Sequence, residues 1–204
     1  IFSTHNTIAS QIAILLKAHC YNSTYSHRNF SFEIALSDAY LLLKENYTEN
    51  ALVGGIDELT EDSFTLLKEL GYYKENTAGE GASFFLLTNK AEENCYAEVK
   101  AVQMYSNTSI EEVKMKSGTL FKEYQIDRLV IGSRKDKINK NDLDVIELVN
   151  ADCKIIYYKH LSGEYPTANA FAFGMAVEIF KNKEVKNLLI YNHYSENNHS
   201  FILL

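Results

Sequence analysis

The sequence contains little proline and little glycine, with one proline and nine glycines among 204 residues. This scarcity excludes a collagen-like or low-complexity chain. No apolar run approaches the ~20 residues that a membrane-spanning helix needs, so we expect no membrane span. The net charge of −7 argues against a surface dedicated to nucleic acid, and we expect no nucleic-acid partner. The remaining composition, 46% apolar and 23% charged, is typical of a globular domain.

Cysteine is scarce as well. The three cysteines, Cys20, Cys95 and Cys153, form no disulfide framework, because their number is odd and their spacing is wide. Reduced thiols suit the cytosol, so we expect a cytoplasmic protein. The chain also begins with Ile1-Phe2 rather than with methionine, which predicts a fragment or a processed piece.

The usual phosphate and metal motifs are missing. The chain has neither GxxxxGK[ST] nor GxGxxG, and residues 79–81 form only a GxG whose central acid would repel a phosphate. It has no CxxC and no HExxH. His5, His19 and His27 are too irregularly spaced to indicate a metal site. We therefore expect no cofactor and no metal.

Strand and helix patterns alternate along the chain. Apolar or alternating runs predict strands over residues 51–55, 83–87, 96–102, 129–131, 154–158, 188–191 and 200–204. Helices are predicted from Thr7, over 30–44, between Thr60 and Gly71, from Ser109, and over 141–149 and 167–180. The alternation predicts an α/β fold with both sheet faces covered. The apolar helices over 30–44 and 167–180 predict a central helical layer between two sheets.

Three connecting segments complete this reading. The polar and aromatic residues 21–25 predict a short strand, followed by a turn into the long helix. The charged stretch 89–94 predicts a link between two halves, residues 1–94 and 95–204. Residues 192–198 predict a polar loop, and His193 and His199, which flank its Asn-rich turn, are expected to be solvated. The phenylalanine pairs 84/85 and 171/173 are predicted to lie in the core.

Four stretches then carry a family resemblance. They read ALVGGIDE (51–58), GEGASFFLL (79–87), KHLSGEYPTANAF (159–171) and NNHSFILL (197–204). In this order they resemble the β-ketoacyl synthases of the thiolase-like superfamily, in particular a short divergent bacterial branch. The resemblance implies a thiolase-like layered αβαβα fold. Because the family's domain is longer, it also implies that the opening strands and helices of the first half are missing.

The resemblance also marks three site positions. Family members use a cysteine at the N-terminus of a buried helix, where the helix dipole favours the thiolate. Alignment of the helix puts His27 at that position, or Ser26 or Arg28 if the register shifts by one. Two histidines complete the family's site, and their positions are held here by Ser133 and Glu164. All three catalytic positions have therefore changed residue type.

These changes imply a loss of condensing activity. A carboxylate at Glu164 would repel the malonyl carboxylate and the developing enolate. By resemblance we expect a non-catalytic, chain-length-factor-like subunit of a fatty-acid or polyketide-type pathway, for example an aryl polyene pathway. It would pair with an active ketosynthase, or with itself, through the sheet edge at residues 21–25, and meet an acyl-carrier protein.

Other interpretations stay open from the sequence alone. His27, Ser133 and Glu164 could form a new Ser-His-acid set, which would make the chain an active condensing or acyl-transfer enzyme of 3-oxoacyl-carrier-protein synthase type. The chain could also be an acyl-binding module that kept the pocket and lost the chemistry. In the plainest interpretation, His27 only hydrogen-bonds within a polar loop.

Overall fold

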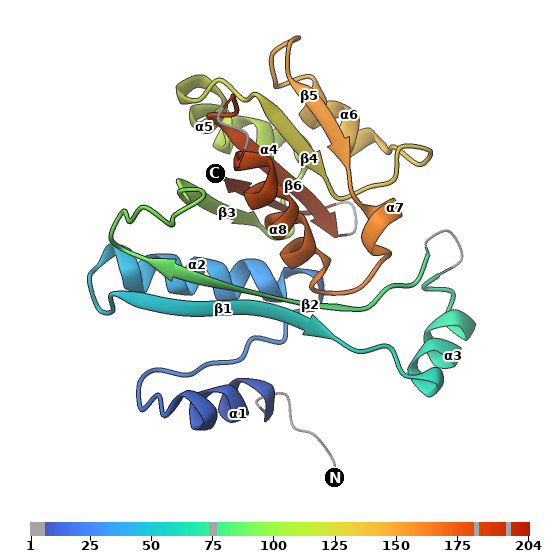
Figure 1. Cartoon of the computed structure of the whole chain (residues 1–204). Helices are drawn as coiled ribbons and strands as arrows, with labels where there is room; N and C mark the ends of the chain where they lie inside the picture. The colour runs from blue at the N-terminus through green and yellow to red at the C-terminus, as the bar shows by residue number, and fades with distance from the viewer. Residues whose placement is uncertain (1–6, 74–76, 182–183, 195–196) are drawn as a thin grey trace.

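The computed structural model describes residues 7–73, 77–181, 184–194 and 197–204 (Figure 1). Helices and strands alternate along these ranges, with one short 3-10 turn before the second helix. In chain order the elements are α1 (Thr7–Leu16), η1 (Arg28–Phe30), α2 (Ser31–Lys44), β1 (Asn50–Asp57), α3 (Glu61–Glu69), β2 (Gly81–Thr88), β3 (Ala101–Tyr105), α4 (Ile110–Lys116), α5 (Gly118–Glu123), β4 (Arg128–Ile131), α6 (Lys140–Ile146), β5 (Lys154–Tyr157), α7 (Lys159–Ser162), α8 (Ala168–Phe180), β6 (Leu188–Tyr194) and β7 (Asn198–Leu203).

The strands form two separate sheets. β1 and β2 pair antiparallel, from Asn50 opposite Thr88 to Asp57 opposite Gly81. The second sheet has five strands in the order β3-β7-β6-β4-β5. Its strands β4, β5 and β6 run parallel, while β7 is antiparallel to both β6 and β3. The carboxyl ends of three parallel strands therefore meet at one edge of this sheet.

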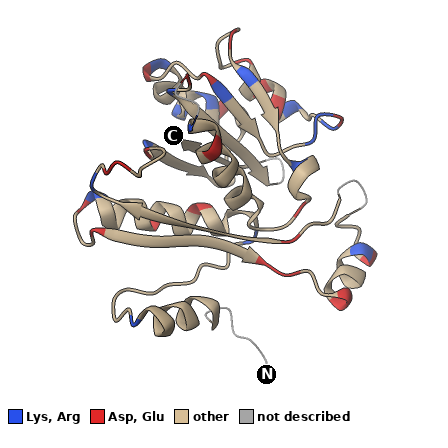
Figure 2. Ribbon diagram, in the orientation of Figure 1, with Lys and Arg blue, Asp and Glu red and all other residues tan. Residues whose placement is uncertain are grey.

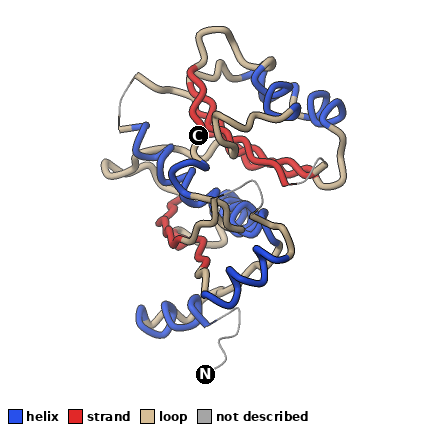
Figure 3. The backbone as a smooth tube through the Cα atoms, turned by 90° about the vertical axis from the view of Figure 1, so that its right-hand side faces the viewer, coloured by secondary structure: helices blue, strands red, loops and turns tan. Residues whose placement is uncertain are grey.

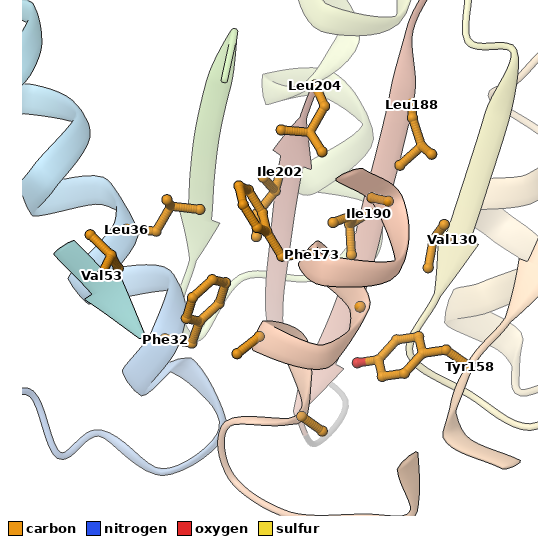
Figure 4. Packing of buried hydrophobic residues seen from close by; sticks show 14 of the residues in the cluster. Phe32, Leu36, Val53, Val130, Tyr158, Phe173, Leu188, Ile190, Ile202 and Leu204 are labelled. Carbon is orange, nitrogen blue, oxygen red and sulfur yellow. The ribbon is translucent and has the colours of Figure 1, made fainter. Parts of the chain in front are cut away.

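Helices α2 and α8 form a layer between the two sheets (Figures 1 and 3). The core around them combines Phe32 and Leu36 of α2 with Val53 of β1, Phe173 of α8 and Ile190 of β6, all at most 6% exposed (Figure 4). Burial of such side chains is the main stabilising term in folding. The predicted layered α/β architecture, with its central helical layer, is confirmed.

Three short helices cover the other face of the five-stranded sheet. Val113 of α4, Leu120 of α5 and Val145 of α6 pack on Tyr191 and Phe201 of the sheet. The sheet is thus buried on both faces, as parallel strands require.

Hydrogen bonds from the ends of elements fix this arrangement locally. The side-chain oxygen of Thr60 accepts from the Ser63 amide and begins α3, as the sequence predicted. A longer-range bond comes from Asp57 at the end of β1, whose Oδ2 accepts from the Thr167 amide (2.8 Å) and hydroxyl (2.6 Å). The carboxylate therefore anchors the start of α8 to the two-stranded sheet, where it also complements the helix dipole.

The two-stranded sheet leaves its outer face open. Leu52, Phe84 and Leu86 are between 43% and 72% exposed there. Asp57 is the only charged residue in β1 and β2, so both strands are nearly free of charge colours in Figure 2. α1 lies on the far side of these strands from α8 (Figure 1) and has no buried residue.

The predicted strand over residues 21–25 is wrong. These residues have no strand assignment, because no described strand runs beside them and a strand exists only through hydrogen bonds to a neighbour. The hydroxyls of Tyr21 and Tyr25 lie 3.0 Å apart, and Asn22 donates to the Ala9 carbonyl.

The polar loop over 192–198 and its solvated histidines are also wrong. The two strands continue through most of this segment, with His193 opposite His199 and Tyr194 opposite Asn198. The ring of His199 is fully buried and its Nδ1 lies 2.9 Å from the Tyr191 hydroxyl. The polar residues Asn192 and Ser200 of these strands are accommodated because both donate hydrogen bonds to the buried carboxyl group of Glu33.

Smaller differences follow from strand and helix geometry. Phe84 is 43% exposed because alternate side chains of β2 face opposite sides, so only Phe85 of that pair turns inward. α2 is not buried all round, since Leu41 is 53% exposed. The strand predicted over 96–102 begins only at Ala101. Within the described ranges no helix is long and apolar enough to cross a bilayer; α2, with 14 residues, is the longest.

The aromatic contacts of the central layer give the first prediction. Phe173 packs edge-on against Phe85 (4.7 Å between centroids) and Phe32 (5.7 Å). Phe173→Ala should therefore lower the free energy of unfolding by about 3–5 kcal/mol, measured by urea denaturation. Phe84→Ala is the matched control, because that ring points outward, and it should cost less than about 1 kcal/mol. Equal losses in the two variants would contradict this description of the core.

Candidate functional site

One candidate site is a cavity of about 800 Å³. It lies where the parallel strands β4, β5 and β6 end, which is the usual ligand position in open α/β sheets. The 3-10 turn that precedes α2 closes one side. Six side chains that line it carry the chemistry discussed below: Asn29, Tyr72, Ser133, Lys159, Glu164 and His193.

A tight corner at the start of α2 brings Asn29 into this cavity. Arg28 has a left-handed φ of +50°, which is uncommon for a residue other than glycine. The Ser31 hydroxyl holds the corner, because it donates to the Arg28 carbonyl (2.7 Å) and accepts from the His27 amide (2.8 Å). As a result His27 is exposed, whereas Asn29 is only 6% exposed.

Two glycine-containing segments meet at Glu164, beside Asn29. The backbone at Ala78 pairs with Glu164 in an isolated parallel bridge. Gly163 has a φ of +72°, and a Cβ there would lie 2.8 Å from the Ala78 carbonyl oxygen. Only glycine fits that position. This contact explains why two of the stretches that carried the resemblance, 79–87 and 159–171, belong to one site.

Four polar side chains are joined at the base of the cavity. The Lys159 ammonium and the Glu164 carboxylate form a salt bridge of 2.7 Å, with Lys159 6% and Glu164 16% exposed. Asn29 Nδ2 donates to the same carboxylate oxygen (3.3 Å), and the Tyr72 hydroxyl donates to Asn29 Oδ1 (3.4 Å). Burial, together with the charge of Glu164, raises the pKa of Tyr72 to about 12, so its hydroxyl stays a donor at neutral pH.

The three site positions carried over from the family do not share one cavity. Ser133 and Glu164 both line the large cavity. His27 lines a second cavity of about 390 Å³, together with Arg28 and with Tyr194, which lines both cavities. None of the hydrogen bonds among the described residues joins His27 to Ser133 or Glu164. The corner residue beside Glu164 is Asn29, two positions further along the chain.

Sequence reasoning missed four of the cavity residues. Lys159 had a signal, since it begins the Lys-x-x-x-Gly stretch that ends just before Glu164. Tyr72 and His193 had none, because they approach the site only through the tertiary fold. Asn29 was missed because an alignment of the helix gives no information on the 3-10 turn in front of it.

No cysteine lines either cavity. Cys20 and Cys95 are exposed, and Cys153 is half-buried. Burial raises the pKa of the Cys153 thiol to about 11, so it is protonated at neutral pH and a poor nucleophile. In the part of the chain that the structure describes, no group of three or more His, Cys, Asp or Glu residues could hold a metal ion.

A buried polar network lies behind the cavity. The Glu33 carboxylate of α2 is fully buried and accepts hydrogen bonds from Ser200 (2.8 Å), Asn192 (3.4 Å) and Asn169. The Tyr158 hydroxyl in turn donates to Asn169 Oδ1 (2.6 Å). Burial raises the pKa of Glu33, although the three donors oppose this shift.

Comparisons with known proteins identify the fold. No protein-family model matches the sequence, and no curated protein matches it. Solved structures do match. A chain of the AntDE:AntF complex, in which a type II polyketide synthase acyl-carrier protein is bound to its ketosynthase, superimposes with a TM-score of 0.82 and 13% identity. The chain has the ketosynthase fold.

Two other ketosynthase-fold structures agree. The ishigamide ketosynthase/chain length factor gives a TM-score of 0.71 with 17% identity, and 3-oxoacyl-[acyl-carrier-protein] synthase III from Aquifex aeolicus gives 0.66 with 14% identity. The first two comparisons cover 98% and 97% of this chain, but only 62% and 60% of those chains. The thiolase-like fold predicted from the sequence is confirmed. The chain spans about three fifths of the length of these two structures.

The buried carboxyl of Glu33 gives the second prediction. Because its pKa is raised in the folded state above the ordinary 4.5, the folded protein binds this proton more tightly than the unfolded chain. The group's contribution to stability is therefore complete below pH 4.5 and is lost as pH rises through the folded pKa. Glu33→Gln keeps the accepting oxygen and cannot ionise. The free energy of unfolding of Glu33→Gln minus that of the wild type, both measured by denaturation, should thus increase as pH rises above 4.5. A difference that does not change with pH would contradict the raised pKa.

Proposed function

We propose that this chain is a ketosynthase-like subunit that does not itself catalyse condensation. It works beside an active ketosynthase in a fatty-acid or polyketide-type pathway of the cytoplasm, as a chain length factor does, with aryl polyene synthesis as one example. Its other partner is an acyl-carrier protein. The observation that carries this proposal is the cavity wall itself, in which an amide, Asn29, occupies the buried helix corner beside a carboxylate.

The chemistry of these groups supports a silent site. An amide side chain is not a nucleophile, so Asn29 cannot accept an acyl group as a cysteine thiolate can. Condensation also develops negative charge on an enolate, which requires donors or cations nearby. Glu164 presents negative charge instead, and the ammonium of Lys159 is already paired with it at 2.7 Å. The cavity can therefore bind an acyl group more readily than it can transfer one.

The partners are suggested by the similar structures. One of them contains an acyl-carrier protein bound to its ketosynthase, and another is a ketosynthase paired with a chain length factor. The proposal extends the same partners to this chain. The size-exclusion experiment on assembly distinguishes a heterodimer with an active ketosynthase from a homodimer.

The third prediction concerns acylation. After incubation with acyl-loaded carrier protein, intact-mass spectrometry should show no acyl adduct on this chain, while an active ketosynthase in the same tube is acylated. A stoichiometric adduct would overturn the proposal and favour the active condensing enzyme, and peptide mapping would then show whether Ser133 carries it.

A pair of cysteine variants sharpens this experiment. Asn29→Cys places a thiol at the buried corner in front of α2, where helix-terminal amides favour the thiolate. We expect this variant to become acylated. His27→Cys is the matched control, because residue 27 lies two positions away, outside the cavity, and it should stay unmodified. Preferential modification of the His27→Cys variant would show that residue 27 is the family's nucleophile position.

The fourth prediction concerns assembly. When the full-length protein is mixed with the active ketosynthase of its pathway, size-exclusion chromatography with light scattering should show a one-to-one complex at micromolar concentration. If the two proteins elute as separate monomers, the paired-subunit proposal is wrong. Elution of this chain as a homodimer beside a separate ketosynthase would replace the heterodimer by self-pairing.

A further inference from the structure

The start of α6 and the end of β6 meet in the wall of the large cavity. Asn139, which precedes α6 as its N-cap, and His193, the penultimate residue of β6, both line that cavity. Their side chains are in contact, because Asn139 Nδ2 lies 2.7 Å from His193 Nε2. Histidine is the residue type whose charge changes near physiological pH. The contact therefore joins the first turn of a helix to a titratable ring.

Asn139 holds the first turn of α6 through a capping box. Its Oδ1 accepts from the Asp142 amide (3.0 Å), and Asp142 Oδ2 accepts from the Asn139 amide (3.1 Å). Because Oδ1 is used in this way, the group that Asn139 turns to the ring is its NH2 group, which can only donate. His193 Nε2 must then accept. The observed contact therefore requires a ring that carries no proton on Nε2.

The same ring nitrogen faces a second group. Asp142 Oδ1 lies 3.4 Å from His193 Nε2, is fully buried and has no hydrogen-bond partner among the described residues. A buried acceptor without a donor is unfavourable, and a proton on Nε2 would supply the donor. That proton would also oppose the NH2 group of Asn139, since both groups would then be donors. Nε2 can therefore satisfy Asn139 or Asp142, but not both.

Asp142 is the acid closest to hand for the ring. Within the described residues, no other acidic side chain has an oxygen within 4.0 Å of a His193 nitrogen. Tyr157 and Tyr191 stay protonated, because burial first and the charge of Asp142 next raise their pKa values. His199 faces His193 from β7, and its own Nδ1 lies 2.9 Å from the Tyr191 hydroxyl.

The other charges near the ring are of both signs. Three ion pairs involve the cavity wall or α6: Lys159–Glu164, Arg134–Asp136 and Lys114–Asp144. The remaining charged side chains of the wall are Glu111, Lys137 and Lys140. These three are exposed, so solvent and salt screen them, whereas the carboxyl group of Asp142 is fully buried. Asp142 therefore has the stronger effect on the ring and favours its protonated form.

We propose that His193 and the start of α6 form a pH-sensitive switch in the cavity wall. While Nε2 carries no proton, it accepts from Asn139 and supports the capping box. When Nε2 gains a proton, it donates to Asp142 Oδ1, and the Asn139 side chain turns away. The Asp142 amide then loses its acceptor, and the first turn of α6, which lines the cavity with Lys140 and Asn141, is loosened. The switch itself does not depend on the proposed function.

The first test is an NMR titration of the full chain labelled with ¹⁵N, from about pH 8 to about pH 6. The ring nitrogens report the protonation of His193, and hydrogen exchange reports the protection factor of the Asp142 amide. This protection should fall about fivefold, the effect of losing an N-cap, over the pH interval in which Nε2 gains its proton. His160, exposed on α7, is the internal control, because its titration should leave α6 unchanged.

Three variants separate the switch from ordinary titration. Asn139→Ser keeps a hydroxyl that can cap α6 but has no NH2 group, so His193 should titrate while the protection of the Asp142 amide stays constant. His193→Gln supplies an uncharged acceptor near the position of Nε2, and its cap should not respond to pH. In Asp142→Asn the carboxylate is gone, so the ring should gain its proton only at lower pH than in the wild type.

Three results would overturn the switch. One is a wild-type ring that carries a proton on Nε2 at about pH 8. Another is an Asp142 amide whose protection does not follow the titration of His193. The third is an equal loss of protection in the wild type and Asn139→Ser, since Asn139 would then not be the group that moves. None of these measurements needs a ligand or a partner.

Ligand binding tests whether the switch controls the cavity, and this step rests on the proposed function. Hexanoyl-pantetheine should bind the wild type at least about threefold more weakly at about pH 6 than at about pH 8, because the loosened turn lines the cavity. His193→Gln should bind it equally at both pH values. Equal binding by the wild type would overturn control of the cavity. If neither protein binds the probe at any pH, the proposed acyl-binding function is wrong, and the NMR titration still decides the switch.

Discussion

The buried carboxylate of Glu33 is the constraint on which the arrangement of this fold depends. It belongs to α2, and its donors come from α8, β6 and β7. A buried carboxyl group loses its hydration, and here three hydrogen bonds to its Oε1 offset part of that loss. If α2 moved away from the five-stranded sheet, the Glu33 carboxyl group would lose its hydrogen bonds to Asn192 and Ser200. The central helix is thus held in position by a polar requirement as well as by apolar packing.

The candidate site inherits its geometry from that constraint. Asn29 lies four residues before Glu33, and Asn192 is the neighbour of His193 in β6. Fixing Glu33 therefore fixes both the corner that carries Asn29 and the strand end that carries His193. The resulting cavity has a Lys159–Glu164 ion pair and several amide and hydroxyl groups, but no cysteine. The proposal of a non-condensing subunit rests on this chemistry.

Much of the fold could be predicted from the sequence because its signals are local. The Thr60 and Ser109 caps begin helices through bonds to amides three residues away. Apolar runs formed strands at residues 51–55, 83–87 and 129–131, and two apolar helices formed the central layer. Prediction failed where the cause lay elsewhere in the chain. Residues 21–25 have no neighbouring strand in the described part of the chain, and His199 is buried in a strand although a polar pattern precedes it.

By itself, the sequence determined the order of helices and strands, their caps, and the four ordered stretches that identify a ketosynthase fold. Only the tertiary structure decided which residues reach the cavity. The left-handed turn at Arg28, closed by Ser31, directs Asn29 inward and His27 outward, and no periodic pattern reveals such a turn. The contact between His193 Nε2 and Asn139 likewise joins residues that are 54 positions apart in sequence. Periodicity reports the face on which a side chain lies, whereas its partners and its charge state depend on what the fold places opposite it.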